Sequence, residues 1–232
     1  SRTSTYYDTH LGKGDEIADY SISYDLSSTN TKSFTRYIYE GDKRAGELTA
    51  SDADSSMIRS DSFRKDLDAA ALSVTVDDFT RSRTSTYYDT HLGKGDEIAS
   101  YVHSYVLDTD QVSTTTFYWY NNKKATDPLV NSEEMMTTSE TYRGKWNNND
   151  LAWDSKAIIS KTFYDTRLGK GEEIAKYTHN YYSNIAQIKA TTFYWYNNKK
   201  AADLLPVNSD DAMTTSETYR GEWTDNDLAW NS

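Results

Sequence analysis

The stretch "YYDTHLGKGDEIA" (residues 6–18) decides the architecture of this chain of 232 residues, because it recurs. It returns letter for letter at residues 87–99 and as "FYDTRLGKGEEIA" at residues 163–175, after shifts of 81 and 76 residues. "TTFYWYNNKKATD" (residues 115–127) and "MTTSETYRG" (residues 136–144) also return, at residues 191–203 and 213–221. Recurrence at such a period indicates tandem structural units. We expect a divergent repeat at 1–81, a second at 82–159 and a third, truncated one at 160–232.

Alternating side chains within the repeats predict strands. In "SYVHSYVLD" (residues 100–108), Tyr101, His103 and Tyr105 fall on one face, and Val102 and Val106 fall on the other. Thr, Tyr, Phe and Trp favour a pleated, half-buried surface. We therefore expect an all-β fold: an extended antiparallel β-hairpin ribbon or solenoid of three tandem repeats with about five strands each. Residues 64–76 also show helical spacing, although their counterpart in the second repeat favours strands.

Glycines mark the turn inside the recurring stretch. Its "LGKG" core places two glycines between an acidic strand end and the next apolar residue. Glycine adopts positive φ at little cost, so these positions are typical of a hairpin loop. We expect structural repeat turns at Gly12, Gly14, Gly93, Gly95, Gly169 and Gly171.

Composition excludes several classes of function. The formal net charge of −11 disfavours a nucleic-acid partner, because the phosphate backbone would be repelled. The sequence has no apolar run long enough for a membrane span. Without cysteine it has no disulfides and no thiolate metal ligands. Its 20 Tyr and 6 Trp argue against disorder. These side chains can bury a ring while their O–H or N–H group stays in contact with water, which suits a thin sheet.

Candidate catalytic residues occur in every repeat, whereas an active site is normally unique. Asp8, Asp89 and Asp165 occupy one recurring position, and we interpret them as acids that cap a turn. Arg167 replaces His10 and His91 in the third repeat, which argues against a metal or proton-transfer role there.

Acidic pairs recur beside the glycine loop, at residues 15–16, 96–97 and 172–173. Neighbours in a strand point to opposite faces, so we interpret each pair as solvated edge charge. The acidic turns at 51–56, 147–150, 208–212 and 224–227 do not match an EF-hand loop. A bound calcium remains an open alternative. We expect no catalytic residue, cofactor or metal site.

Aromatic runs in the second and third repeats form a candidate binding face. Repetition of such a face would give avidity for glycans, but packing across strands also accounts for the rings. The face comprises Tyr118, Trp119, Tyr120, Tyr194, Trp195 and Tyr196.

The stretch "TRYIYEGDKRAGELT" (residues 35–49) resembles the tyrosine–aspartate (YD) repeat of Rhs-type proteins. The resemblance is carried by Tyr37, Tyr39, Glu40, Arg44, Leu48 and Thr49. It implies a large bacterial extracellular or cell-surface protein whose repeats form a spiralling ribbon of hairpins, in some members a hollow shell. An independent Tyr-rich surface β-repeat array is the alternative.

These observations favour a non-catalytic structural segment of a stalk, fibre or shell wall. Its partners would be neighbouring repeats or copies of itself, with filament formation by strand addition as a variant. The alternative is an adhesin or lectin-like module that binds glycans through its Tyr and Trp faces. An enzyme, such as a polysaccharide-cleaving β-repeat protein, would need in one repeat a carboxylate constellation that the others lack.

Overall fold

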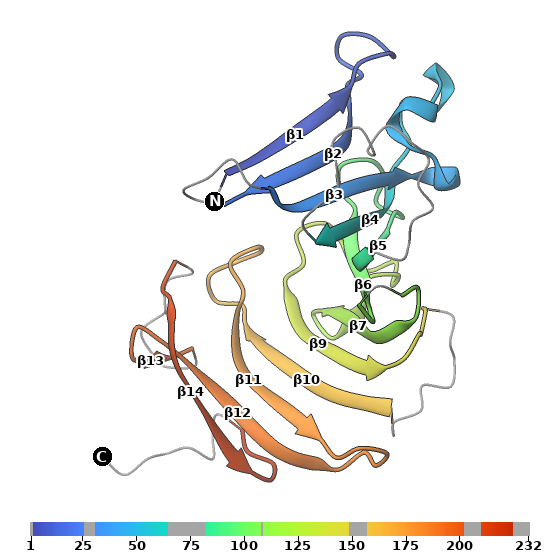
Figure 1. Ribbon diagram of the computed structural model, residues 1–232. Coiled ribbons are helices and arrows are strands. Elements are labelled where there is room, and N and C mark those ends of the chain that lie inside the picture. Colours follow the sequence, from blue (N-terminus) through green and yellow to red (C-terminus); the bar gives the residue numbers. More distant parts are fainter. Residues whose placement is uncertain are drawn as a thin grey trace. The chain divides into compact units, whose positions relative to one another are not determined.

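A computed structural model describes residues 2–25, 31–64, 82–107, 109–148, 157–201 and 210–224 (Figure 1). These residues form fourteen β-strands and three 3-10 turns, and no α-helix occurs among them. The all-β class expected from the alternating side chains is therefore confirmed. The chain divides into two compact units, an N-terminal unit (Ser1–Thr114) and a C-terminal unit (Thr115–Ser232).

The N-terminal unit is an up-and-down antiparallel sheet in which each strand pairs with the next along the chain. The strands are β1 (Arg2–Asp8), β2 (Ile17–Tyr24), β3 (Thr31–Tyr39), β4 (Met57–Arg64), β5 (Ser82–Asp89) and β6 (Ile98–Tyr105). Three 3-10 turns connect β3 to β4: η1 (Glu40–Asp42), η2 (Ala45–Glu47) and η3 (Ala50–Asp52).

The C-terminal unit, taken by itself, has the same up-and-down order. Its strands are β7 (Val112–Tyr120, which begins three residues before the boundary), β8 (Lys123–Lys124), β9 (Met136–Arg143), β10 (Ile158–Asp165), β11 (Ile174–Tyr181), β12 (Ile188–Tyr196), β13 (Lys199–Lys200) and β14 (Met213–Arg220). The long strands lie in the order β7, β9, β10, β11, β12, with β14 also on β12. The short strands β8 and β13 fold back onto β7 and β12.

Each copy of the opening stretch forms a β-bulge followed by a glycine loop. The pairing register shifts between Tyr6 and Tyr7 in the β1–β2 hairpin, and at the corresponding place in the β5–β6 and β10–β11 hairpins. In the first loop, Gly12 and Gly14 have φ values of +110° and +99°. Their four counterparts in the other loops also have positive φ. A side chain at such positions would strain the backbone.

Aromatic rings on neighbouring strands pack against one another in both units. In the N-terminal unit the rings of Tyr20, Phe34 and Phe63 follow one another at centroid distances of 5.4 and 5.9 Å. In the C-terminal unit Phe163 stacks on Tyr177 at 4.6 Å. Such pairs contribute about 0.5–1.5 kcal/mol beyond their buried area. The apolar clusters recorded among the described residues are small, so cross-strand ring packing contributes to the stability of the sheet.

About five strands are expected in each repeat, and five described strands lie within residues 82–159 (β5 to β9) and five within 160–232 (β10 to β14, with β10 beginning at Ile158), one of each five being only two residues long. Residues 1–81 have four described strands, and the segment 64–76, for which the sequence favours a strand over a helix, lies outside the described residues apart from Arg64. The division into three repeats likewise remains a prediction from the sequence.

Candidate functional site: the β4–β5 and β9–β10 strand pairs

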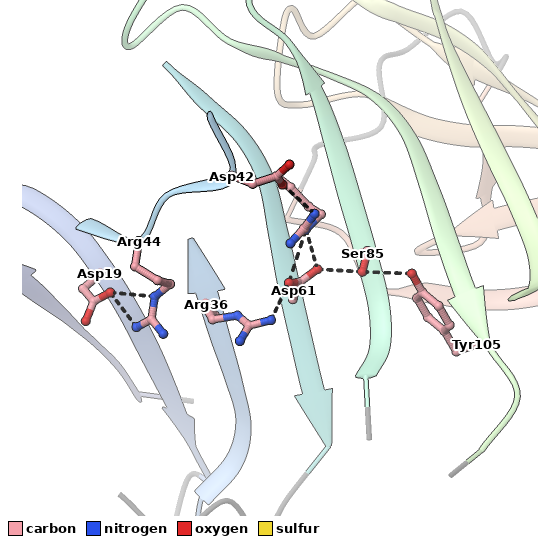
Figure 2. A network of polar contacts seen from close by, with 8 residues as sticks. Asp19, Arg36, Asp42, Arg44, Asp61, Ser85 and Tyr105 are labelled. Atoms are coloured by element: carbon pink, nitrogen blue, oxygen red, sulfur yellow. Dashed lines mark hydrogen bonds and ion pairs between the residues drawn. The ribbon is translucent and has the colours of Figure 1, made fainter. Parts of the chain in front are cut away.

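A buried carboxylate lies at the centre of the β4–β5 pair. Asp61 on β4 is fully buried and lies opposite Ser85 on β5. The Ser85 hydroxyl donates to its Oδ1 at 2.6 Å, and Arg36 Nη2 donates to its Oδ2 at 3.0 Å. Arg59 Nε lies 3.2 and 3.3 Å from the two carboxylate oxygens, and its Nη1 lies 3.1 Å from Asp42 Oδ1. Figure 2 shows Arg36, Asp42 and Ser85 around Asp61. Two aspartates and two arginines thus balance one another's charge.

The contacts within this cluster account for the buried charge of Asp61 in structural terms. A buried charge needs ionic partners and hydrogen bonds, and Asp61 has both. Ser85 is only 1% exposed, donates its hydroxyl hydrogen bond to Asp61 and accepts a bond from the Tyr105 hydroxyl at 3.3 Å. A serine nucleophile needs an activating base and room for a substrate. The arrangement therefore does not support nucleophilic catalysis.

The β9–β10 pair has a different ion pair at the corresponding position. Glu140 on β9 lies opposite Lys161 on β10, and Lys161 Nζ is 2.8 Å from Glu140 Oε1. Tyr142 donates its hydroxyl to Glu140 Oε2 at 2.9 Å. In sequence, Glu140 corresponds to Asp61 and Lys161 corresponds to Ser85. In both pairs an acid on the earlier strand faces a donor on the later one.

A serine–tyrosine contact also occurs in both pairs. Ser60 Oγ lies 3.1 Å from Tyr88 Oη across β4 and β5, and Ser139 Oγ lies 3.0 Å from Tyr164 Oη across β9 and β10. Burial raises the pKa of both tyrosines, and the serine bond partly opposes this rise. Both phenols therefore remain neutral hydrogen-bonding groups near pH 7.

A glutamate from the glycine loop binds the start of the preceding strand. Glu97 Oε1 accepts the Met57 N–H at 2.8 Å, and Glu173 Oε1 accepts the Met136 N–H at 3.1 Å. Each glutamate also accepts a glycine N–H of its own loop at 2.9 Å through Oε2. The interpretation of the acidic pairs as solvated edge charge is therefore incorrect for these two glutamates, which bind two backbone amides each.

The recurring aspartates cap turns, as the sequence predicts. Oδ1 of Asp8 and Oδ1 of Asp165 accept backbone N–H groups two residues ahead, at 2.9 and 3.0 Å. The His10 ring also bonds to Asp8, and Arg167 binds Asp165 through Nε at 3.0 Å and Nη2 at 2.6 Å. In the β5–β6 loop, Asp89 accepts the backbone N–H of His91 and also bonds to the His91 ring, as Asp8 does with His10.

Hydrogen bonding shifts the pKa of these capping groups. The backbone and side-chain bonds from His10 lower the pKa of Asp8. The bond to Asp8, helped by the Leu48 carbonyl, raises the pKa of His10. Burial raises the pKa of Asp165, but its bonds to Arg167 outweigh burial and lower that pKa overall. These shifts follow from turn contacts and do not require a catalytic role.

The six aromatic residues of the predicted binding face do not lie on one face of their strands. Adjacent residues alternate, so Trp119 and Trp195 point away from the face of Tyr118 and Tyr194. Lysine Nζ atoms lie 6.0 Å from the ring centroid of Trp119 and 5.5 Å from that of Trp195. All six aromatic residues are buried or half-buried. Most of their ring area is therefore already in contact with the sheet.

No cluster of three or more His, Asp or Glu side chains able to hold a metal ion occurs among the described residues. The same part of the chain contains no helix of the length and apolarity needed to cross a membrane. Comparison of the chain with protein-family models, with curated proteins and with solved structures found no match.

Sequence reasoning missed the cluster around Asp61. Arg36 corresponds to Phe117 and Phe193 in the other repeats, and Arg59 corresponds to Thr138 and Thr215. The sequence does show arginine at a position that is phenylalanine in the two related stretches, and it shows an aspartate on the next expected strand. Together these two differences could have indicated an ion pair between the strands.

Proposed function

We propose that this chain is a non-catalytic structural segment in which three tandem repeats build an extended antiparallel ribbon. The observation that carries the proposal is that the β4–β5 contacts recur at β9–β10. Both pairs have an acid facing a donor, a serine–tyrosine bond, and a loop glutamate on a methionine N–H. The corresponding residues stand 79 positions apart on β4 and β9, and 76 positions apart on β5 and β10 and in the loops that follow them.

These two strand pairs are the places where one predicted repeat ends and the next begins. A repeat protein is stabilised by nearest-neighbour contacts of this kind and grows by adding further units. The resemblance to YD repeats supports the same role in a large bacterial extracellular or cell-surface protein. A stalk, a fibre or a shell wall would each use such a ribbon.

Insertion of one extra repeat tests the proposal. A second copy of residues 82–157, inserted after residue 157, adds one period. The original β9 is then followed by a copy of β5, and the copy of β9 is followed by β10. We expect circular dichroism per residue to be unchanged and the maximum dimension in small-angle X-ray scattering to increase. The matched control is insertion of residues 82–119 alone, which is about half a period and should disrupt folding. Loss of β-structure in the full-period variant would refute modular construction.

A glycan-binding adhesin remains the second proposal, because Trp119 and Trp195 recur at one position and each keeps a minor part of its surface exposed. A glycan array with Trp119→Ala and Trp195→Ala as controls separates the two functions. Saturable binding that both substitutions abolish would favour the adhesin.

A further inference from the structure

Two strands have an edge with no neighbour among the described residues. β14 pairs with β12, and β1 pairs with β2, but the described strands provide no partner for the opposite edge of either one. Residues 213–218 of β14 are exposed, as are five of the seven residues of β1. An exposed strand edge has backbone groups able to pair with another strand.

The sequences of these two edges match strands that are already paired inside the molecule. β14 and β9 are the same octapeptide, MTTSETYR, and β9 pairs with β10. The whole of β1, RTSTYYD, also occurs in β5, which pairs with β4. Each edge therefore has the residues that form a strand pair elsewhere in this chain.

We infer that β14 of one molecule pairs antiparallel with β1 of a second copy, in the register of the β4–β5 and β9–β10 pairs. Asp61 faces Ser85 and Glu140 faces Lys161, and the corresponding positions here are Glu217 and Ser4. The inference rests on the proposed function and identifies its partner surface. Successive copies would join head to tail, because the two edges differ.

The side chains at these edges match the internal pairs. Glu217 Oε2 accepts the Tyr219 hydroxyl at 2.5 Å, as Glu140 Oε2 accepts that of Tyr142. Glu217 Oε1 then corresponds to the atom with which Glu140 binds Lys161. The Ser4 hydroxyl would donate to it, as Ser85 donates to Asp61.

Two further contacts are expected in this register. Ser216 corresponds to Ser60 and Ser139, so it would bond to Tyr7, a residue that is 59% exposed. Glu16 already accepts the Gly14 N–H at 3.0 Å through Oε2. Its Oε1 would accept the Met213 N–H of the other copy, as Glu97 and Glu173 accept the methionine amides that begin β4 and β9.

Charge substitution at the facing positions tests the register. At low ionic strength, where screening is weak, sedimentation velocity over a range of concentrations measures self-association of the whole chain. The Ser4→Lys variant recreates the Lys161–Glu140 pair and should strengthen association about two- to fivefold. The Ser4→Glu variant places two carboxylates opposite each other and should weaken association by a similar factor. Adding Glu217→Lys to Ser4→Glu should restore it.

Matched controls make the same changes of charge on exposed loop residues that belong to neither β1 nor β14. Ser183→Glu lies in the loop between β11 and β12, and Glu133→Lys lies in the loop before β9. Neither control should change association. Circular dichroism of each variant checks that the fold is retained.

Two results would overturn the inference. One is a monomeric wild type and a monomeric Ser4→Lys variant at every concentration, both with native circular dichroism. The other is association that Ser4→Glu does not weaken. The repeat-insertion experiment judges the proposed function separately, because an inserted repeat can fold in a protein that stays monomeric.

Discussion

The Asp61→Asn substitution removes the negative charge at the centre of the β4–β5 pair while keeping the shape of the side chain. The side chains of Arg36 and Arg59 are only 12% and 17% exposed, so two guanidinium groups would face a neutral amide. Removing one partner of a buried ion pair typically costs about 3–5 kcal/mol. Both arginines retain some contact with water and Arg59 retains Asp42, so we expect a loss of about 2–4 kcal/mol in unfolding free energy.

The acids at the corresponding sequence positions, Glu140 and Glu217, supply graded comparisons. Glu140→Gln removes one partner from Lys161, whose side chain is 29% exposed, and should cost about 1 kcal/mol. Glu217→Gln alters an exposed edge residue and should stay within about 0.5 kcal/mol of wild type in dilute protein. Asp42→Asn is the local control, because Asp42 is 73% exposed and its bond to Arg59 is screened by water.

Urea unfolding followed by circular dichroism measures this series. With an unchanged slope, the midpoint should fall most for Asp61→Asn, less for Glu140→Gln and least for Glu217→Gln. An Asp61→Asn variant as stable as the Asp42→Asn control would refute the reasoning. The buried cluster would then contribute nothing that a neutral amide could not replace.

Three further substitutions test the glycine loops and their acids. Gly171→Ala has space around its new methyl group but φ is +81°, so backbone strain should cost about 1–2 kcal/mol in urea unfolding, and an unchanged midpoint would contradict this. The pKa of His10 is raised by Asp8, so its stabilisation is complete below the unfolded value of 6.5 and is lost as pH rises through the folded value. The melting temperature should therefore fall across that range, and His10→Arg should weaken this dependence without removing it, because His91 keeps the equivalent contact with Asp89; thermal scans at several pH values measure the change. Glu97→Gln should cost about 1 kcal/mol more than Glu16→Gln, because Glu97 also holds the amide that begins β4. Hydrogen exchange at that amide should accelerate only in the Glu97 variant, and equal losses in both would count against the contact.

Local patterns were sufficient to predict the strands, the loops and the capping aspartates. Alternation of polar and apolar residues has a period that only strands share, and glycine is the residue that tolerates positive φ. Asp8 contacts a backbone amide two residues away, so its role can be deduced from neighbouring letters. The Asp61 cluster could not be deduced in this way, because Arg36 lies 25 residues from its partner and meets it only through the β3–β4 register.

Strands β9 and β14 separate the two kinds of information most clearly. Both read MTTSETYR, and this octapeptide alone predicts that each is a strand with the same two faces. The arrangement of the strands is needed to learn that Glu140 is paired with a lysine on a neighbouring strand, whereas Glu217 is exposed at an edge. Strand formation depends on the local side-chain pattern, whereas burial and ion pairing depend on which strand lies alongside.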